Sequence, residues 1–255
     1  MRNYINQFRS DGIAVLPNED SASFKVLKES ICSALSVDNL EMLHHACDRQ
    51  GINALRLATY RDINSLDDWE NLYYSMANST LIQLLGPDLL IQRKLNLSIQ
   101  MPEDETSVLG LHMDTLSGQS PFELVMWVPF TGVSQSNGMY YFDRKTSFEI
   151  RQEMPTCEDR GLEYLRQKYW NRRKELEVNE GDVVIFSGTL FHGNVVNKTS
   201  TTRISVNCRF KNLFSPDAPG LESAERGSGI FYKLLATGAV TDIGMEYVKH
   251  RDCFE

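Results

Sequence analysis

The sequence predicts one domain of mainly β-structure with flanking helices, arranged as a large sandwich or barrel. Its 255 residues exceed an average domain, but a single large β-sandwich or barrel can use that length. Residues 1–86 carry mostly helical patterns, whereas residues 87–214 are typical of strands separated by turns. No repeat or linker divides the chain, so we expect a single domain over residues 1–255, with a C-terminal tail over 215–255.

The helical part begins with a short helix over residues 1–9, where apolar side chains recur at helical spacing. A short apolar strand over residues 13–16 follows and is stopped by Pro17. Polar capping residues then introduce a helix that runs to about residue 34. From residue 38 to residue 85 the pattern stays mostly helical.

The β-part opens with a strand candidate over residues 89–99, in which apolar and polar side chains alternate. In a barrel with a polar pocket, the polar face of such a strand points inward. The apolar side chains are Leu95, Leu97 and Ile99, and the polar ones are Asn96, Ser98 and Gln100. Further strands are predicted at residues 122–130, 139–142, 183–186 and 203–210, with another candidate at 147–150. A charged helical insertion over residues 156–175 is expected to cover one edge of the barrel.

Composition and charge exclude several classes of protein. A formal charge of -8 argues against a nucleic-acid partner. No apolar run approaches the roughly 20 residues of a membrane span, and residues 1–11 lack the apolar core of a signal peptide. Five scattered cysteines without a Cys-x-x-Cys pair fit reduced thiols. We therefore expect a cytoplasmic protein without a membrane partner.

Two distant histidines and one aspartate form a candidate metal site. His112 and Asp114 are one residue apart, so on an extended strand their side chains share a face. His192 follows another predicted strand. Two imidazoles and a carboxylate can occupy three adjacent positions around a divalent metal and leave the others open, as in mononuclear non-haem iron(II) oxygenases. His112, Asp114 and His192 are thus the candidate catalytic metal ligands.

A second group of residues fits the binding of 2-oxoglutarate. An oxygenase that uses this cosubstrate needs a fixed cation for its distal carboxylate, and the planar guanidinium of arginine suits the task. Arg203 follows His192, and Ser205 lies on the same strand face and can donate a second hydrogen bond. Gln100, Asn96 and Ser98 lie on the inward face of their strand, and one of them is expected to help bind the cosubstrate, with Gln100 preferred.

The strand that carries Arg203 continues with polar residues on the same face. Asn207 is a candidate for substrate contact, and Arg209 is expected to form an ion pair at the end of the barrel. Trp127 is a candidate for the pocket wall, although a strand aromatic more commonly packs in the core.

These motifs resemble the iron(II)/2-oxoglutarate-dependent oxygenases, and within them the phytanoyl-CoA dioxygenase-like branch. The resemblance runs from near the N-terminus to about Phe214 and leaves the tail unmatched. The matching segments are His112-Met-Asp114, Val125-Met-Trp-Val-Pro-Phe130, Ser136-Asn-Gly-Met-Tyr140, Gly181-Asp-Val-Val-Ile-Phe186, His192 and Arg203-Ile-Ser205. The chain also looks similar to small bacterial enzymes of carbohydrate biosynthesis.

The resemblance implies a double-stranded β-helix, also called a jelly-roll or cupin-like barrel, with the metal at its open mouth. Iron(II), 2-oxoglutarate and dioxygen are the implied cofactor and cosubstrates, and the distal carboxylate of 2-oxoglutarate would meet Arg203 and Ser205. Related halogenases lack the carboxylate ligand, so Asp114 favours hydroxylation first, with desaturation, ring formation or epimerisation as variants. The implied substrate is a small polar metabolite, such as a sugar or a nucleotide-linked sugar.

Two other hypotheses remain open from the sequence. The first is a non-catalytic jelly-roll sensor or binding protein that keeps a metal for structure. The second keeps the fold but uses a different divalent metal for hydrolysis or isomerisation. A homodimer is a further expectation, because the tail can either cover the domain or pair with a second copy.

Overall fold

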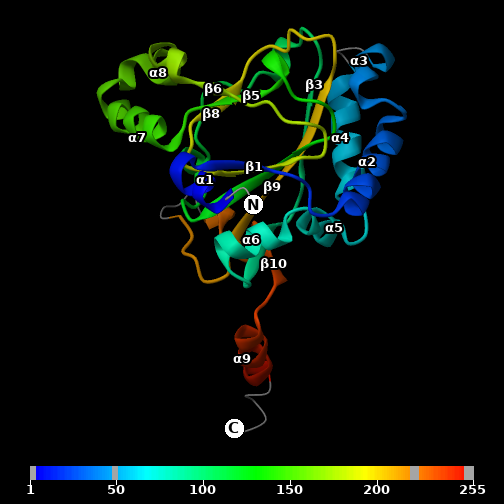
Figure 1. Ribbon diagram of the computed structural model, residues 1–255, viewed down its shortest axis with the longest axis vertical. Helices are drawn as coiled ribbons and strands as arrows, with labels where there is room; N and C mark the ends of the chain where they lie inside the picture. Colours follow the sequence, from blue (N-terminus) through cyan, green and yellow to red (C-terminus); the bar gives the residue numbers. More distant parts are fainter. Residues whose placement is uncertain (1–3, 48–50, 219–223, 250–255) are drawn as a thin grey trace.

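The computed structural model describes residues 4–47, 51–218 and 224–249. Figure 1 shows two β-sheets at the centre, with α2, α3, α4 and α5 on one side and α7 and α8 on the other. The helices are α1 (Tyr4–Asp11), α2 (Ser21–Leu35), α3 (Leu43–Ala46), α4 (Ile52–Ile63), α5 (Trp69–Ser75), α6 (Asn78–Leu85), α7 (Arg144–Glu153), α8 (Gly161–Tyr169) and α9 (Ala239–Lys249). The strands are β1 (Ile13–Leu16), β2 (Leu89–Gln92), β3 (Asn96–Gln100), β4 (Glu123–Pro129), β5 (Met139–Tyr141), β6 (Lys174–Glu175), β7 (Val183–Ser187), β8 (His192–Asn194), β9 (Arg203–Asn212) and β10 (Tyr232–Ala236).

The larger sheet has the strand order β1-β7-β4-β9-β2-β10, and β3 pairs with β9 beside β2. The smaller sheet has the order β6-β5-β8. Neighbouring strands in both sheets run antiparallel. The prediction of mainly β-structure with flanking helices is therefore confirmed.

Alternation along β9 separates the main hydrophobic core from the functional face. Ile204, Val206, Cys208 and Phe210 are buried in the core that α2, α4, α5 and α6 share with the larger sheet. The intervening residues of β9 point to the other face, because successive strand residues face opposite sides. They begin at Arg203 and include two further cationic side chains. The helices thus cover one face of the sheet and leave the other face available for a site.

One buried amide ties the helical layer to this sheet. Asn64 follows the last residue of α4, and its Nδ2 donates to the Leu95 carbonyl at 3.0 Å. The backbone N–H of Leu95 donates in return to Asn64 Oδ1 at 2.7 Å. Leu95 directly precedes β3, so this exchange satisfies buried backbone groups at the start of a strand that lines the site.

The segment that follows β5 is more helical than the sequence indicated. Residues 147–150 were a strand candidate, but they lie inside α7, which starts after an Asp143 cap that accepts from the Thr146 N–H. The buried Ile150 and Leu165, from α7 and α8, pack with Phe142 and Phe191 in a separate core. The helical insertion therefore begins near residue 144, earlier than the predicted residue 156.

Two other expectations need correction. The strand predicted over residues 89–99 is divided into β2 and β3, because residues 93–95 leave the extended conformation. The C-terminal tail supplies a strand, β10, which extends the larger sheet by pairing with β2. Beyond β10, α9 projects from the body of the molecule (Figure 1). Among the described residues, no helix combines the length and apolar character needed to cross a bilayer.

Candidate metal and cosubstrate site

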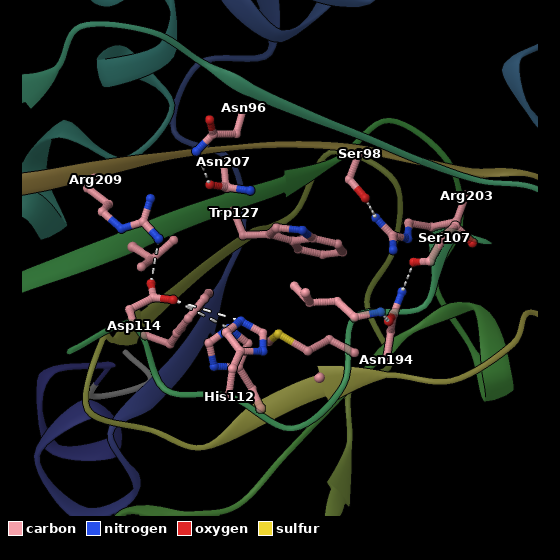
Figure 2. A pocket seen from close by; sticks show the side chains of 16 residues that line it. Asn96, Ser98, Ser107, His112, Asp114, Trp127, Asn194, Arg203, Asn207 and Arg209 are labelled. Atoms are coloured by element: carbon pink, nitrogen blue, oxygen red, sulfur yellow. Dashed lines mark hydrogen bonds and ion pairs between the residues drawn. The ribbon is translucent and has the colours of Figure 1, made fainter. Parts of the chain in front are cut away.

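A cavity of about 320 Å³ is lined by residues from both sheets. β3, β4, β7 and β9 contribute side chains from the larger sheet, and β5 and β8 contribute from the smaller one. Figure 2 shows His112 and Asp114 at one end of the cavity and Arg203 at the other, with the Trp127 indole between them. The cavity therefore has one end rich in metal-ligating groups and one cationic end.

The structure brings the three predicted metal ligands together. Donor atoms of His112, Asp114 and His192 all lie within 4.8 Å of one another. Asp114 Oδ1 lies 3.9 Å from Nε2 of His112 and 4.0 Å from Nε2 of His192. Two imidazoles and a carboxylate suit a divalent iron centre with open positions, so the residues fit the metal that the sequence implied.

The backbone that carries His112 and Asp114 differs from the expected strand. His112 forms an isolated antiparallel bridge with His192, in which each backbone N–H donates to the carbonyl of the other residue, at 3.0 and 2.9 Å. Asp114 is the first residue of the 3-10 helix η3 (Asp114–Ser117). Only His112 is therefore in β-pairing, and the turn into η3 directs the carboxylate toward the imidazoles.

Each histidine is oriented by a backbone carbonyl two residues before it. Nδ1 of His112 lies 2.9 Å from the Gly110 carbonyl oxygen, and Nδ1 of His192 lies 3.0 Å from that of Leu190. A carbonyl oxygen can only accept, so we assign the ring proton to Nδ1 in both residues. Both Nε2 lone pairs are then free for a metal. Such contacts commonly orient metal-binding histidines.

A glycine keeps the smaller sheet close to the metal ligands. A Cβ atom on Gly193, next to His192 in β8, would lie 2.6 Å from the Tyr140 hydroxyl and 2.8 Å from the Leu109 carbonyl oxygen. The second contact is with backbone, which cannot move aside cheaply. Gly193 therefore allows the approach of the loop before His112 to β8.

Electrostatics at this end favour an ionised Asp114 beside a neutral His192 imidazole. Burial would raise the pKa of Asp114, but Arg209 and His192 outweigh it and lower the pKa below its ordinary value. Burial lowers the pKa of His192 to about 4, although Asp114 opposes this effect. At neutral pH both groups are thus in the protonation states that bind a metal.

At the opposite end, Arg203 is buried without a carboxylate partner. Its Nη1 donates to Ser205 Oγ at 2.6 Å and to Ser98 Oγ at 2.9 Å, and its Nη2 donates to Gln100 Oε1 at 2.9 Å. Its Nε donates to the Asn137 carbonyl at 3.2 Å. Only 5% of Arg203 is exposed, and burial lowers its pKa to about 10. No acidic group among the described residues lies within ion-pair distance of it.

The other predicted cosubstrate residues divide into two groups. Ser98 and Gln100 contact the Arg203 guanidinium directly. In the pairing of β3 with β9, Gln100 lies opposite Arg203 and Ser98 lies opposite Ser205. Asn96 does not contact Arg203; its Nδ2 donates to Asn207 Oδ1 at 3.0 Å, and both asparagines line the cavity. Their roles in cosubstrate or substrate binding stay predictions.

The sequence did not indicate two contributions to the cavity. The first concerns Arg209, for which the sequence named no partner. Its Nη2 lies 2.7 Å from Asp114 Oδ2, so Arg209 lies beside the metal ligands. The second is the wall formed by Ser107 and Leu109, from the segment before His112, together with Asn194 at the end of β8. Ser107 and Leu109 follow no strand pattern in the sequence, so only the approach of their segment to β8 brings them to the cavity.

Two facing antiparallel sheets with a His-Asp-His set between them define a cupin-like fold with a candidate metal site. Solved structures of non-haem enzymes share this fold. ThoJ, a non-haem monooxygenase in complex with nickel, superposes with a TM-score of 0.61 at 18% identity, covering 92% of this chain and 84% of that chain. The expected double-stranded β-helix fold is thus confirmed.

Two further solved structures have the same fold. SnoK, an alpha-ketoglutarate-dependent carbocyclase from nogalamycin biosynthesis, gives a TM-score of 0.54 at 16% identity, with 92% of this chain and 96% of that chain covered. HygX from Streptomyces hygroscopicus, with nickel and 2-oxoglutarate bound, gives 0.55 at 14% identity, with 92% and 97% covered. No protein-family model and no curated protein matches the chain.

Proposed function

We propose that this protein is an iron(II)- and 2-oxoglutarate-dependent oxygenase that acts on a small, uncharged, polar molecule. The observation that carries the proposal is the buried Arg203, which has only neutral partners and lies in the same cavity as the metal-ligand set. A buried charge is unfavourable unless it is paired. We infer that an anionic ligand completes this site.

The two ends of the cavity define the shape of that ligand. It needs a carboxylate at Arg203 and metal-binding atoms at the His-Asp-His set, and 2-oxoglutarate has both. When bound, iron and 2-oxoglutarate supply the oxidising chemistry, which couples decarboxylation of the cosubstrate to oxidation of the substrate. Arg203 orients the distal carboxylate and is itself held by Ser205, while Val125, Trp127 and Phe186 line the apolar wall that limits water.

The charges in the cavity favour an uncharged substrate. Apart from the metal-ligand set, the charged side chains that line it are Arg203 and Arg209. Arg209 is already paired with Asp114 and Glu123, and 2-oxoglutarate would neutralise Arg203. A charged substrate would therefore find no free partner of opposite sign. Side-chain amides and hydroxyls remain, as suits a sugar or a similar polyhydroxylated molecule. These lining residues are Asn96, Asn207, Asn194 and Ser107.

Hydroxylation is the first expected outcome, because Asp114 supplies the third protein ligand to the metal. Ring formation and epimerisation are the alternatives, and structures of this fold include the carbocyclase SnoK and the epimerase SnoN. Mass spectrometry of the product separates them: hydroxylation adds an oxygen atom, ring closure removes two hydrogen atoms, and epimerisation leaves the mass unchanged. Membership of the phytanoyl-CoA dioxygenase-like branch stays part of the proposal.

The central test is anaerobic reconstitution of the wild-type protein with iron(II) and 2-oxoglutarate. We expect a weak visible charge-transfer band, and His112→Ala should abolish it. A folded wild-type protein without the band would refute the assignment. A band without release of succinate above background would favour a non-catalytic sensor, and turnover that continues without oxygen would favour hydrolysis or isomerisation.

Substrate class is tested by measuring succinate release with a panel of sugars and their phosphorylated counterparts. Neutral sugars should stimulate release more than the phosphates do, because none of the described residues would offer a free cation in the cavity once 2-oxoglutarate is bound. Stronger stimulation by the phosphates would contradict an uncharged substrate. A homodimer stays a prediction, which sedimentation velocity can test. The cytoplasmic location also stays a prediction.

A further inference from the structure

Arg209 connects the metal carboxylate to a buried polar network. It lies on β9 and faces the cavity, with its side chain 14% exposed. Nη2 lies 2.7 Å from Asp114 Oδ2, Nη1 donates to Gln92 Oε1 at 3.2 Å, and Nε lies 3.4 Å from Glu123 Oε1. Nη1 and Nη2 thus form hydrogen bonds with two different side chains, while Nε makes an ion-pair contact with Glu123 without a hydrogen bond.

The two oxygens of Asp114 have different surroundings as a result. Oδ2 is bound by Arg209, whereas Oδ1 faces the Nε2 atoms of His112 and His192 at 3.9 and 4.0 Å. A carboxylate with both oxygens free can rotate or bind a metal through both of them. The contact with Arg209 withdraws one oxygen and leaves the other as the ligand. One more position at a bound metal would then stay open for cosubstrate or oxygen.

Arg209 is connected to the C-terminal tail through Glu123 and Tyr232. Glu123 is fully buried, and its Oε2 accepts hydrogen bonds from the Ser120 backbone N–H at 3.2 Å and from the Tyr232 hydroxyl. Tyr232 begins β10 and is fully buried. A continuous chain of contacts therefore leads from β10 through Glu123 and Arg209 to Asp114.

We propose that Arg209 is a positioning residue that fixes Asp114 as a ligand through one oxygen, and that Glu123 and Tyr232 fix Arg209. The proposal rests on the proposed function, because it takes Asp114 as a metal ligand. It assigns a role to β10, which lies in the tail that the sequence motifs left unmatched. The tail would then contribute to the metal site without touching the metal.

The test measures binding of Co(II) and its visible spectrum in the full-length protein. Loss of such supporting contacts typically costs 10- to 100-fold in metal affinity. We expect Arg209→Met to weaken Co(II) binding by about that factor and to change the ligand-field spectrum, because Asp114 becomes free to bind through both oxygens. Arg209→Lys should recover part of the affinity. Tyr232→Phe, which removes one hydroxyl, should shift both readouts in the same direction by a smaller amount.

Two control variants separate this role from others. Arg61→Met makes the same substitution at an exposed position and should change nothing. Arg203→Met should leave Co(II) affinity and spectrum unchanged while weakening 2-oxoglutarate binding. If Arg209→Met fails to fold, Arg209→Lys and Tyr232→Phe decide the question.

Three results would be decisive. Folded Arg209 and Tyr232 variants with wild-type Co(II) affinity and spectrum would overturn the proposal. An Arg209→Met protein with normal Co(II) binding but weakened 2-oxoglutarate binding would also overturn it, since Arg209 would then be a cosubstrate ligand. A wild-type protein that binds no Co(II) would instead refute the proposed function on which this inference rests.

Discussion

Replacing Arg203 by methionine should have opposite effects on the ligand-free protein and on 2-oxoglutarate binding. In the ligand-free protein, burial lowers the pKa of Arg203 from 12.5 to about 10. At neutral pH the residue is charged in both folded and unfolded states, so this difference corresponds to roughly 3 kcal/mol of unfavourable charge burial. Methionine removes this unfavourable free energy of charge burial, but it also loses the hydrogen bonds to Ser98, Ser205 and Gln100. We expect the variant to be at least as stable as the wild type.

Binding of 2-oxoglutarate should change in the other direction. Removing one partner of a buried, hydrogen-bonded charge pair costs about 2–5 kcal/mol. A loss of about 3 kcal/mol corresponds to roughly a 100-fold weaker affinity, since each 1.4 kcal/mol is a factor of ten. At a 2-oxoglutarate concentration about 100 times the wild-type Kd, ligand binding stabilises the wild type by about 2.7 kcal/mol and the variant by about 0.4 kcal/mol.

Thermal unfolding with Ni(II), with and without 2-oxoglutarate, measures both effects in one experiment. For a protein of this size, 1 kcal/mol corresponds to about 2–4 °C in Tm. The wild type should therefore gain about 5–10 °C from 2-oxoglutarate, and the Arg203→Met variant about 1 °C. An equal gain in both proteins, or a ligand-free variant that unfolds several degrees below the wild type, would show that Arg203 is a structural residue. Arg61→Met should behave as wild type.

Three further predictions concern the metal site and its support. In the metal-free protein, burial holds the pKa of native His192 at about 4. Between pH 6.5 and 4 the unfolded chain therefore takes up a proton at this residue that the native state does not. The free energy of unfolding should fall by roughly 3 kcal/mol over this range through His192 alone. The difference in urea unfolding between wild type and His192→Gln isolates this slope, and a pH-independent difference would contradict it. Gly193→Ala should weaken Co(II) binding, because the new Cβ would lie 2.8 Å from a backbone oxygen. Gly110→Ala should leave Co(II) binding unchanged, because its Cβ would have no atom within 4 Å. Equal Co(II) affinities of the two variants would disprove the steric argument. Asn64→Ala should cost about 3 kcal/mol in urea unfolding, because two buried backbone groups lose their partner, while the exposed Asn71→Ala should cost less than about 0.5 kcal/mol.

The sequence predicted those parts of the fold where a repeating pattern reports burial. Alternation along residues 95–100 correctly placed the polar side chains of β3 on the inward face, where Ser98 and Gln100 meet Arg203. The same alternation could not show the break between β2 and β3. Nor could it distinguish residues 147–150 as part of α7, because four residues contain little more than one helical turn.

The sequence indicated which candidate residues lie together where one strand carries them, but not where loops do. Arg203 and Ser205 lie on one face of β9, so their spacing of two residues was enough to predict that their side chains lie side by side. His112 and Asp114 were correctly grouped with His192, but for the wrong local reason, since Asp114 starts a 3-10 helix. The role of Tyr232 depends on β10 joining the sheet, a pairing far apart in the chain that no local pattern encodes.

The reciprocal backbone pairing of His112 with His192 has a consequence for the kinetics of metal loading. This bridge and the two carbonyl contacts to Nδ1 orient both imidazoles before any ion binds. The side-chain entropy of the two histidines is therefore lost when the protein folds, and not when it binds the metal. Entry of the ion should then be limited by loss of its water shell. The rate of loading should accordingly follow the water-exchange rates of different divalent ions, with cobalt entering faster than nickel.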